Sequence, residues 1–433
     1  MIKEFDYENK PIVEIVNEII IESVKRNASD IHFDPTPTTL KVRIRIDGEL
    51  IDFAVVPDFV KKNLITRIKI VAGMNITESR LPQDGAIKNT VEGIALDLRV
   101  SSLPIVDGEK IVIRILDYSM SEAGLESLGF SDHNFKLVDK FVSMPSGIIL
   151  VTGATGTGKS TTVYAMLQKL NTVERNVITV EDPVEMKIEG INQVQVMSEI
   201  GLTFGHTLRS ILRQDPDVIM IGEIRDDETA RIAVRASITG HLVLSTLHTN
   251  NSLNTIERLL DMEVERYLLG SALNGIVSQR LAKKLCPHCR KTRPTTPYEK
   301  AVFSAALKLD INEIYAPIGC DTCGNDGYLG RISIHEVLML NQDIRDAIIN
   351  NIRKEELRTL VYDKGQTVTL LQDGLQKVML GETSFEEIIR IIDVADDIDA
   401  NDIELKAAII GKPAEEIQVA PTPKPERTYD VLF

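Results

Sequence analysis

The chain has 433 residues, 43% of them hydrophobic, which is enough apolar material for two or three domains with large cores. Its formal net charge of −15 argues against broad, sequence-independent binding to nucleic acid, because such binding needs a basic face. No apolar run reaches the length of about eighteen residues that a membrane-spanning helix needs. The start of the chain also lacks the basic and apolar regions of a secretory signal, so the sequence predicts a cytoplasmic protein.

The first part of the sequence predicts both helices and strands. Apolar residues recur at helical spacing from Pro11 to Lys25. Residues 40–46 alternate apolar and basic side chains, as a half-buried strand does, and Asp47-Gly48 after them is a signal for a hairpin turn. A further helix and two further strands are expected at Val60–Ala72, Ala95–Val100 and Lys110–Leu116.

From Ser131 the pattern changes to helices alternating with apolar strands, which is typical of a parallel α/β sheet. The expected strands are Ile148–Thr152, Val177–Val180, Val218–Ile221 and Leu242–Ser245. The domains predicted so far are an α+β domain at 1–116, a linker rich in Ser, Glu and Gly at 117–130, and an α/β core at 131–285.

An apolar strand, a glycine-rich loop and a helix-forming run follow one another between Gly147 and Leu170. The loop fits G-x-x-x-x-G-K-[ST], which in this context predicts a phosphate cradle, because its backbone N–H groups and the helix N-terminus converge on an anion. Lys159 would contact the β- and γ-phosphates of a nucleoside triphosphate, and Ser160 would hold Mg²⁺. The predicted nucleotide-binding residues of the loop are Gly153, Ala154, Thr155, Gly156, Thr157, Gly158, Lys159, Ser160 and Thr161.

Two of the predicted strands lead into acidic residues. Residues 177–180 run into Glu181-Asp182-Pro183-Val184-Glu185, and residues 217–222 run into Glu223. Because the carboxyl ends of parallel strands meet at one edge of a sheet, these carboxylates are expected beside the phosphate loop. One carboxylate would support the Mg²⁺ shell and another would orient the attacking water.

Two histidines flank the next strand, His241 before it and His248 after it. His248 is the better candidate for a hydrogen bond to phosphate, because it follows the strand at the expected active edge. Arg209 and Arg213 lie four residues apart on one helical face. For them a role toward phosphate, a role toward a neighbouring subunit and plain solvation all stay open.

The four cysteines form two CxxC pairs, Cys286 with Cys289 and Cys320 with Cys323. Two such pairs suit tetrahedral thiolate coordination of Zn²⁺. The thirty residues between them leave room for a helix, expected at Pro297–Leu307. Residues 286–323 are therefore predicted to form a zinc module, which is structural because four protein ligands leave no open position on the metal.

The last part of the chain predicts short strands over Arg331–Leu340 and then helices, within a C-terminal helical region at 324–392. Residues 393–433 are acidic and contain several prolines, which predicts a flexible, solvated tail.

Taken together, these motifs resemble those of the ATPases that drive type IV pilus assembly and type II secretion, from about Ala28 to Ile392. The motifs that carry the resemblance, besides the phosphate loop and the cysteine pairs, are ASDIHFDP, RIRIDGEL, RLPQDG, LDLRVSSLPIVDGEKIVIRIL, ITVEDPVE, INQVQV, GLTF, LRSILRQDPDVIMIGEIRDDETA, TGHLVLSTLHTN and GYLGR.

The resemblance implies an α/β fold in which a RecA-like P-loop ATPase core follows the α+β N-terminal domain, with the tetracysteine zinc module and C-terminal helices after it. It implies a homo-hexamer that hydrolyses ATP with Mg²⁺ on the cytoplasmic face of the inner membrane. The ring would drive pilus, pseudopilus or secretion work through a polytopic inner-membrane platform protein, and no nucleic-acid partner is expected.

The resemblance also suggests roles for individual residues. Glu223 would be the catalytic carboxylate, assisted by Glu181 or Glu185, a choice that the motifs leave open. His248 lies in the family's histidine box. The nucleotide phosphates would also be contacted by arginines of the N-terminal domain, namely Arg99 and Arg114, with Arg80 as a weaker candidate.

The sequence departs from the family pattern at three points. Ala154 and Ser160 replace the usual proline and threonine of the loop, and Ala86 stands where the family usually has arginine. The chain begins close to the second family domain, so the regulator-docking module of longer members is expected to be absent. Alternative functions are a pilus retraction motor, which lacks the tetracysteine module, a hexameric nucleic-acid translocase and a nucleotide-gated scaffold.

Overall fold

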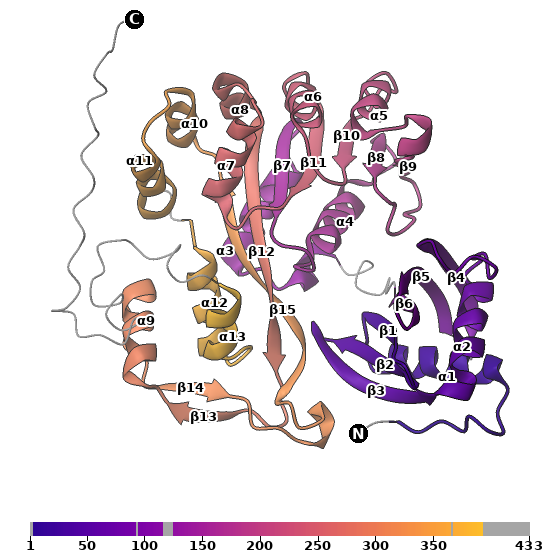
Figure 1. Cartoon of the computed structure of the whole chain (residues 1–433). Helices are drawn as coiled ribbons and strands as arrows, with labels where there is room; N and C mark the ends of the chain where they lie inside the picture. Colours follow the sequence, from indigo (N-terminus) through magenta and orange to yellow (C-terminus); the bar gives the residue numbers. More distant parts are fainter. Residues whose placement is uncertain (1–2, 92–93, 116–123, 365–366, 393–433) are drawn as a thin grey trace, which may run out of the picture. The chain divides into compact units, whose positions relative to one another are not determined.

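The computed structural model describes residues 3–91, 94–115, 124–364 and 367–392 (Figure 1). These residues belong to two compact units, one within Met1–Lys283 and Leu329–Thr367 and the other within Lys284–Tyr328 and Val368–Phe433. The predicted tail at 393–433 and residues 117–123 of the predicted linker at 117–130 lie outside the described residues. Within the described residues, no helix has the length and apolar character needed to cross a bilayer.

The first unit begins with an antiparallel sheet of six strands in the order β3-β2-β1-β6-β5-β4, and helices α1 and α2 pack on its apolar face (Figure 1). The bounds of these elements are α1 Ile12–Lys25, β1 Asp30–Pro35, β2 Thr39–Ile46, β3 Glu49–Pro57, α2 Asp58–Val71, β4 Gln83–Val91, β5 Ile94–Ile105 and β6 Gly108–Ile115.

The predicted alternation in the second strand places its apolar residues in the core. Leu40, Val42 and Ile44 are fully buried. The Asp47-Gly48 turn between β2 and β3 is confirmed, with φ of 49° at Asp47 and 92° at Gly48, values that favour these residue types. The predicted α+β character of this region is therefore confirmed.

The same unit contains a sheet of seven strands in the order β15-β12-β7-β11-β10-β8-β9. Its strands are β7 Gly147–Thr152, β8 Val177–Glu181, β9 Asn192–Gln195, β10 Val218–Ile221, β11 Leu242–Leu247, β12 Leu273–Leu285 and β15 Tyr328–Met339. The helices and helical turns around it are η1 Leu125–Leu128, α3 Asp132–Val142, α4 Lys159–Leu170, η2 Ser198–Ile200, α5 Phe204–Ile211, α6 Asp227–Ile238, α7 Ser252–Asp261, α8 Arg266–Ala272, α10 Gln342–Ile349, α11 Lys354–Arg358 and η4 Thr359–Lys364.

Helices cover both faces of this sheet, as the uninterrupted apolar strands predict. In β7, Ile148 and Leu150 pack with residues of α5, α6, α7 and α8. Ile149 and Val151, which point the other way, pack with residues of α3 and α4. The pairs of β7 with β11, β11 with β10 and β10 with β8 are all parallel. The predicted parallel α/β core is confirmed, and the carboxyl ends of its central strands share one edge.

The region 324–392 differs from the expectation of short strands followed by helices. Residues predicted as short strands over Arg331–Leu340 form one strand, β15, which lies beside β12 at the edge of the core sheet. Residues 334–338 of this strand are buried, because here the strand enters the core. The predicted boundaries at 116, 285 and 323 stay predictions, since the two compact units divide the chain differently and share the region 324–392 between them.

The second unit holds the cysteine pairs and the last helices of the described chain. Its elements are β13 Lys291–Pro294, α9 Pro297–Leu307, β14 Glu313–Ala316, η3 Asp321–Cys323, α12 Leu370–Met379 and α13 Phe385–Ile391. The predicted helix at Pro297–Leu307 is confirmed. It starts with a proline at its first position and with a capping box in which Thr296 and Glu299 satisfy each other's backbone N–H groups.

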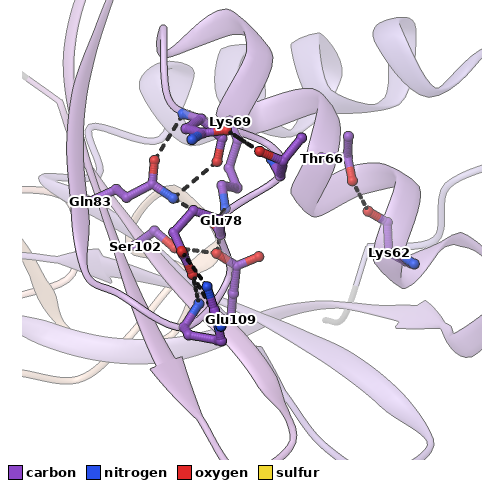
Figure 2. A network of polar contacts seen from close by, with 10 residues as sticks. Lys62, Thr66, Lys69, Glu78, Gln83, Ser102 and Glu109 are labelled. Atoms are coloured by element: carbon purple, nitrogen blue, oxygen red, sulfur yellow. Dashed lines mark hydrogen bonds and ion pairs between the residues drawn. The ribbon is translucent and has the colours of Figure 1, made fainter.

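A buried polar network orders the loop between α2 and β4 in the first unit (Figure 2). Lys69 is 1% exposed, and its Nζ donates to the Glu109 carboxylate at 2.6 Å and to the carbonyl of Glu78 at 2.7 Å. Ser102 donates to the same carboxylate oxygen, and Gln83 donates to the same carbonyl. The network thereby fixes the segment that carries Arg80.

Replacing Lys69 by methionine is expected to lower the free energy of opening of α2 by about 3 kcal/mol, because it leaves the Glu109 carboxylate, which is only 14% exposed, without its cation. Hydrogen exchange of α2 measured in the full chain checks this. Lys62, which is exposed on the same helix, offers the matched control, and Lys62→Met should leave exchange unchanged. Equal protection in both variants would show that the Lys69–Glu109 pair stabilises nothing.

Candidate functional site

The phosphate loop connects the buried strand β7 to helix α4. Gly153, Gly156 and Gly158 have φ of 149°, 81° and 86°, a region that side chains disfavour. A Cβ at Gly153 would also lie 2.5 Å from the backbone oxygen of Gln279, so no larger residue fits there. The loop therefore needs glycine for its shape, and its backbone turns into the first turn of α4 as the motif predicts.

Lys159 begins α4 and folds over the loop. It is 8% exposed, and its Nζ donates to the carbonyls of Gly153 at 2.8 Å and Ala154 at 2.9 Å. Burial lowers the pKa of Lys159, and the nearby Glu223 carboxylate opposes that shift. Ser160 is exposed in the first turn of the helix, where a hydroxyl can reach a cation.

The other predicted loop residues surround this lysine. Thr157 is buried and donates its hydroxyl to the carbonyl of Ala154 at 3.0 Å. Ala154, Thr155 and Gly156 are exposed, and Thr161 is half-buried. The exposed tip and the glycine conformations fit a phosphate group held by the backbone at the N-terminus of α4.

Gln279 of β12 supports the loop, and the sequence analysis did not identify it. It is 2% exposed, its amide donates to the carbonyl of Thr157 at 2.8 Å, and it accepts a hydrogen bond from Thr162 at 2.7 Å. It thus joins the loop and the first turn of α4 to the neighbouring strand. No local motif marks this residue, because its role depends on the pairing of β12 with β7.

Glu223 lies two residues beyond β10, at the edge where the phosphate loop leaves β7. One of its carboxylate oxygens accepts from Arg225 at 2.5 Å, and the other lies 3.2 Å from Nε2 of His248. Burial would raise the pKa of Glu223, but Arg225 and His248 outweigh it and hold the pKa below its usual value. The structure brings Glu223 and His248 together as the sequence predicted.

Arg225 is a further site residue that the sequence analysis did not identify. Its guanidinium lies 3.4 Å from Asp182 as well as contacting Glu223, so it links the two acidic strand ends. Its position two residues after Glu223 is a local signal that could have pointed to it.

The two other candidate carboxylates, Glu181 and Glu185, have different surroundings. Glu181 at the end of β8 is 3% exposed and is hydrogen-bonded by Tyr164 and Thr179, both at 2.5 Å. Glu185 is half-exposed and lies 3.1 Å from Arg99. Burial of Glu181 and exposure of Glu185 distinguish two residues that look equivalent in the sequence.

The arginines predicted to contact phosphate come from β5 and β6. Arg99 and Arg114 lie directly opposite each other in the antiparallel pair, so they share one face of the sheet. Arg99 also donates to the carbonyl of Val184 at 2.5 Å, and Arg114 pairs with Asp30 at 3.2 Å. Both arginines line a cavity of about 630 Å³. Arg80 is strongly exposed and pairs with Glu78 instead.

The remaining candidates, His241, Arg209 and Arg213, each contact residues close to them in the sequence or on a neighbouring helix. His241 lies 2.9 Å from the carbonyl of Ala236 through its Nδ1. Arg209 pairs with Glu228 at 2.5 Å, and Arg213 donates to the carbonyl of Arg209 at 2.8 Å. None of these contacts involves a residue of the phosphate loop.

The four cysteine sulfurs converge in the second unit, all within 4.8 Å of one another. The Sγ of Cys286 lies 3.9 Å from that of Cys320, and the Sγ of Cys323 lies 3.8 Å from those of Cys289 and Cys320. Four thiolates about 2.3 Å from a tetrahedral zinc ion would be about 3.8 Å apart. Residues of this kind at these separations fit Zn²⁺.

The backbone also favours the thiolate form of one member of this cluster, Cys323. The N–H groups of Cys320 and Gly327 both donate to the Sγ of Cys323 at 3.2 Å. Burial would raise the pKa of Cys323, but these N–H groups lower it to about 7. Such second-layer donors are typical of tetracysteine metal sites.

Comparisons with known proteins identify relatives across most of this chain. The family model described as Type II/IV secretion system protein matches residues 6–390. A putative type II secretion system protein E of Escherichia coli strain K12 is 46% identical over 381 residues, which cover 88% of this chain and 77% of that protein. The type II secretion system ATPase E of Vibrio cholerae serotype O1 is 43% identical over 384 residues, covering 89% and 76%.

Solved structures agree with the fold. The pilus retraction motor PilT with bound ADP is 28% identical with a TM-score of 0.61, covering 88% of this chain and 98% of that one. The ATPase DotB of Legionella pneumophila is 20% identical with a TM-score of 0.66, covering 90% and 98%, and supports the fold alone. The chain therefore belongs to the type II/IV secretion system protein family, and within it to the type II secretion system ATPase E family.

Proposed function

We propose that this chain is the ATP-hydrolysing motor of a type II secretion or related pilus-type machine. The observation that carries the proposal is the meeting of Lys159, Glu223 and His248 at one edge of the core sheet, where Glu223 contacts His248 and its charge acts on Lys159. A cation beside an ionised carboxylate is the pairing that phosphoryl transfer to water needs, and this supports the proposal.

In this proposal the loop residues 153–161 bind the phosphates of ATP through backbone N–H groups, and Lys159 turns from the loop carbonyls toward the phosphates. Mg²⁺, held by Ser160, would neutralise phosphate charge when bound. His248 contributes a hydrogen bond near the phosphates. The cysteine cluster would hold Zn²⁺ as a structural ion.

Glu223 is the proposed catalytic carboxylate. Its lowered pKa keeps it ionised at neutral pH, so it can accept a hydrogen bond from the attacking water and orient it. Arg225 and His248 each contact one of its oxygens and hold the carboxylate in one orientation. We assign Arg99 and Arg114 to the stabilisation of phosphate charge.

Coupling to mechanical work follows from the domain organisation that we propose. ATP binding would draw the arginines of the N-terminal domain toward the nucleotide, and hydrolysis would release them, which converts a phosphate contact into rigid-body motion. We propose that the working form is a homo-hexamer on the cytoplasmic face of the inner membrane. Its motion would pass to a polytopic platform protein of the secretion machine.

Replacing Glu223 by glutamine tests the proposal directly. The variant keeps the shape of the side chain but removes its charge, so we expect ATP affinity to stay within a few-fold and the hydrolysis rate at saturating ATP and Mg²⁺ to fall about a hundredfold. Phosphate release measured on the purified chain gives this rate.

The matched control is Glu199→Gln, the same change at an exposed residue of η2. It should hydrolyse ATP at the wild-type rate. Hydrolysis by Glu223→Gln at that same rate would contradict the assignment of Glu223, and a wild-type chain without ATPase activity in its assembled form would contradict the proposed function itself.

A further inference from the structure

Tyr164 joins the phosphate-loop helix to the acidic segment 181–185. It lies in α4, five residues after Lys159, and is 4% exposed. Its hydroxyl donates to Oε2 of Glu181 at 2.5 Å and accepts the backbone N–H of Glu185 at 3.2 Å. One phenol oxygen thus holds both ends of the segment.

Glu181 is hydrogen-bonded through both of its carboxylate oxygens. Besides the contact with Tyr164, its Oε1 accepts from Thr179 at 2.5 Å and from Gln193 of β9 at 3.1 Å. A carboxylate that is 3% exposed needs such donors, because burying it without them would be costly. The hydrogen bonds that Glu181 accepts from side chains therefore all come from Tyr164, Thr179 and Gln193.

Gln193 extends the network to the chain that follows Glu185. Its amide donates to the carbonyl of Met186 at 2.8 Å and accepts the N–H of Ile188 at 2.7 Å. The segment between β8 and β9 is consequently fixed at several points, all of which lead back to Glu181 and Tyr164.

Burial and the Glu181 carboxylate raise the pKa of Tyr164, so the phenol stays protonated and remains a donor at every pH at which the protein would work. Glu185, by contrast, is half-exposed and faces Arg99 at 3.1 Å. The network therefore holds the backbone of Glu185, whereas the Glu185 carboxylate is not part of the network and pairs with Arg99.

We propose that Tyr164 is a positioning residue for ATP hydrolysis, and that Glu181 acts with it by fixing the segment that presents Glu185 rather than by contacting the reacting atoms. The inference rests on the proposed function. Lys159 and Tyr164 are separated by a helical rise of about 7.5 Å, over which a helix is stiff. A shift of the phosphate loop is therefore passed to the acidic segment.

The first test is Tyr164→Phe in the full-length, assembled chain. It removes one hydroxyl and keeps the ring in the core, so KM for ATP should change little while kcat falls about tenfold, because the segment is misplaced by a fraction of an ångström. Tyr267→Phe, the same change at an exposed residue of α8, is the control and should leave both constants unchanged. A Tyr164→Phe enzyme with the wild-type kcat would overturn the proposal.

The second test separates positioning by Glu181 from a catalytic role. Glu181→Ala should lower kcat at least as much as Tyr164→Phe. Glu181→Gln keeps the shape: its amide oxygen can accept from Tyr164, and its amide nitrogen can donate to the hydroxyl of Thr179, so it should lower kcat by only about threefold. A glutamine variant as impaired as the alanine variant, with normal ATP affinity, would show that the charge itself acts on the reaction and would overturn the proposal.

The third test is the double variant Tyr164→Phe with Glu181→Ala. Two residues that act as one unit should lose no more together than the worse single variant, whereas independent residues should multiply their losses. A wild-type chain that does not hydrolyse ATP would count against the proposed function. If the wild type is active and the losses of the two single variants multiply in the double variant, this inference alone is wrong.

Discussion

Replacing Lys159 by alanine is expected to weaken ATP binding about a thousandfold, which corresponds to about 4 kcal/mol. The lysine is 8% exposed at the N-terminus of α4, with its Nζ 2.8 Å and 2.9 Å from two carbonyls of the loop. A cation held in this place would contact phosphate oxygens in an environment with little water, where charge–charge contacts are strong. Titration of the purified chain with a fluorescent ATP analogue in the presence of Mg²⁺ measures the effect.

The same helix provides the control for this variant. Lys169 lies near the other end of α4, is partly exposed and pairs with Asp139. Lys169→Ala should bind ATP like the wild type, because a surface ion pair contributes little. If Lys159→Ala kept an affinity within about threefold of the control, the phosphate-loop assignment would be wrong, since that change is small against the expected loss.

The fold was predictable where a strand has a simple pattern. The alternation of β2 and the apolar run of β7 each follow from their burial on one face or on both faces. The strand β12 was not predicted, because it carries Gln279 and Lys283, both almost fully buried. Such polar residues are tolerated only through partners from elsewhere in the chain, such as the carbonyl of Thr157 for Gln279. A sequence read locally does not contain that information.

In the candidate site, too, some features could be predicted from the local sequence and others depend on the tertiary fold. The phosphate loop and the proximity of Glu223 to His248 follow from a motif and from the parallel order of strands, both visible in the sequence. The difference between Glu181 and Glu185 does not, since it depends on Tyr164 reaching across from another element. Burial therefore decides which of two similar carboxylates is available to a ligand, and burial is a property of the tertiary fold.

Removing zinc is expected to unfold the cysteine-containing part of the second unit. A backbone hydrogen bond joins it to the segment between α12 and α13, with the N–H of Leu285 donating to the carbonyl of Glu382 at 2.8 Å. The Tyr328 hydroxyl lies 2.8 Å from that of Ser384. Four thiolates at these separations would repel one another without a cation, and binding of structural zinc by such sites contributes about 10 kcal/mol or more. Metal loss should therefore loosen α12 and α13 as well as the two cysteine pairs.

The four cysteines of the cluster are all the cysteines of the chain, so a thiol reagent reports on this site alone. Protein purified without chelator should contain one zinc ion per chain by elemental analysis and react slowly with the reagent. A strong chelator should release the zinc, make all four thiols reactive and increase hydrogen exchange over residues 284–328 and 368–392. Cys286→Ser with Cys320→Ser should give the increased exchange without chelator, whereas Ser304→Ala on α9 should not. Zinc-free protein with four slow thiols and unchanged exchange would show that this part of the chain folds without metal, and the cluster would then have no structural ion to hold.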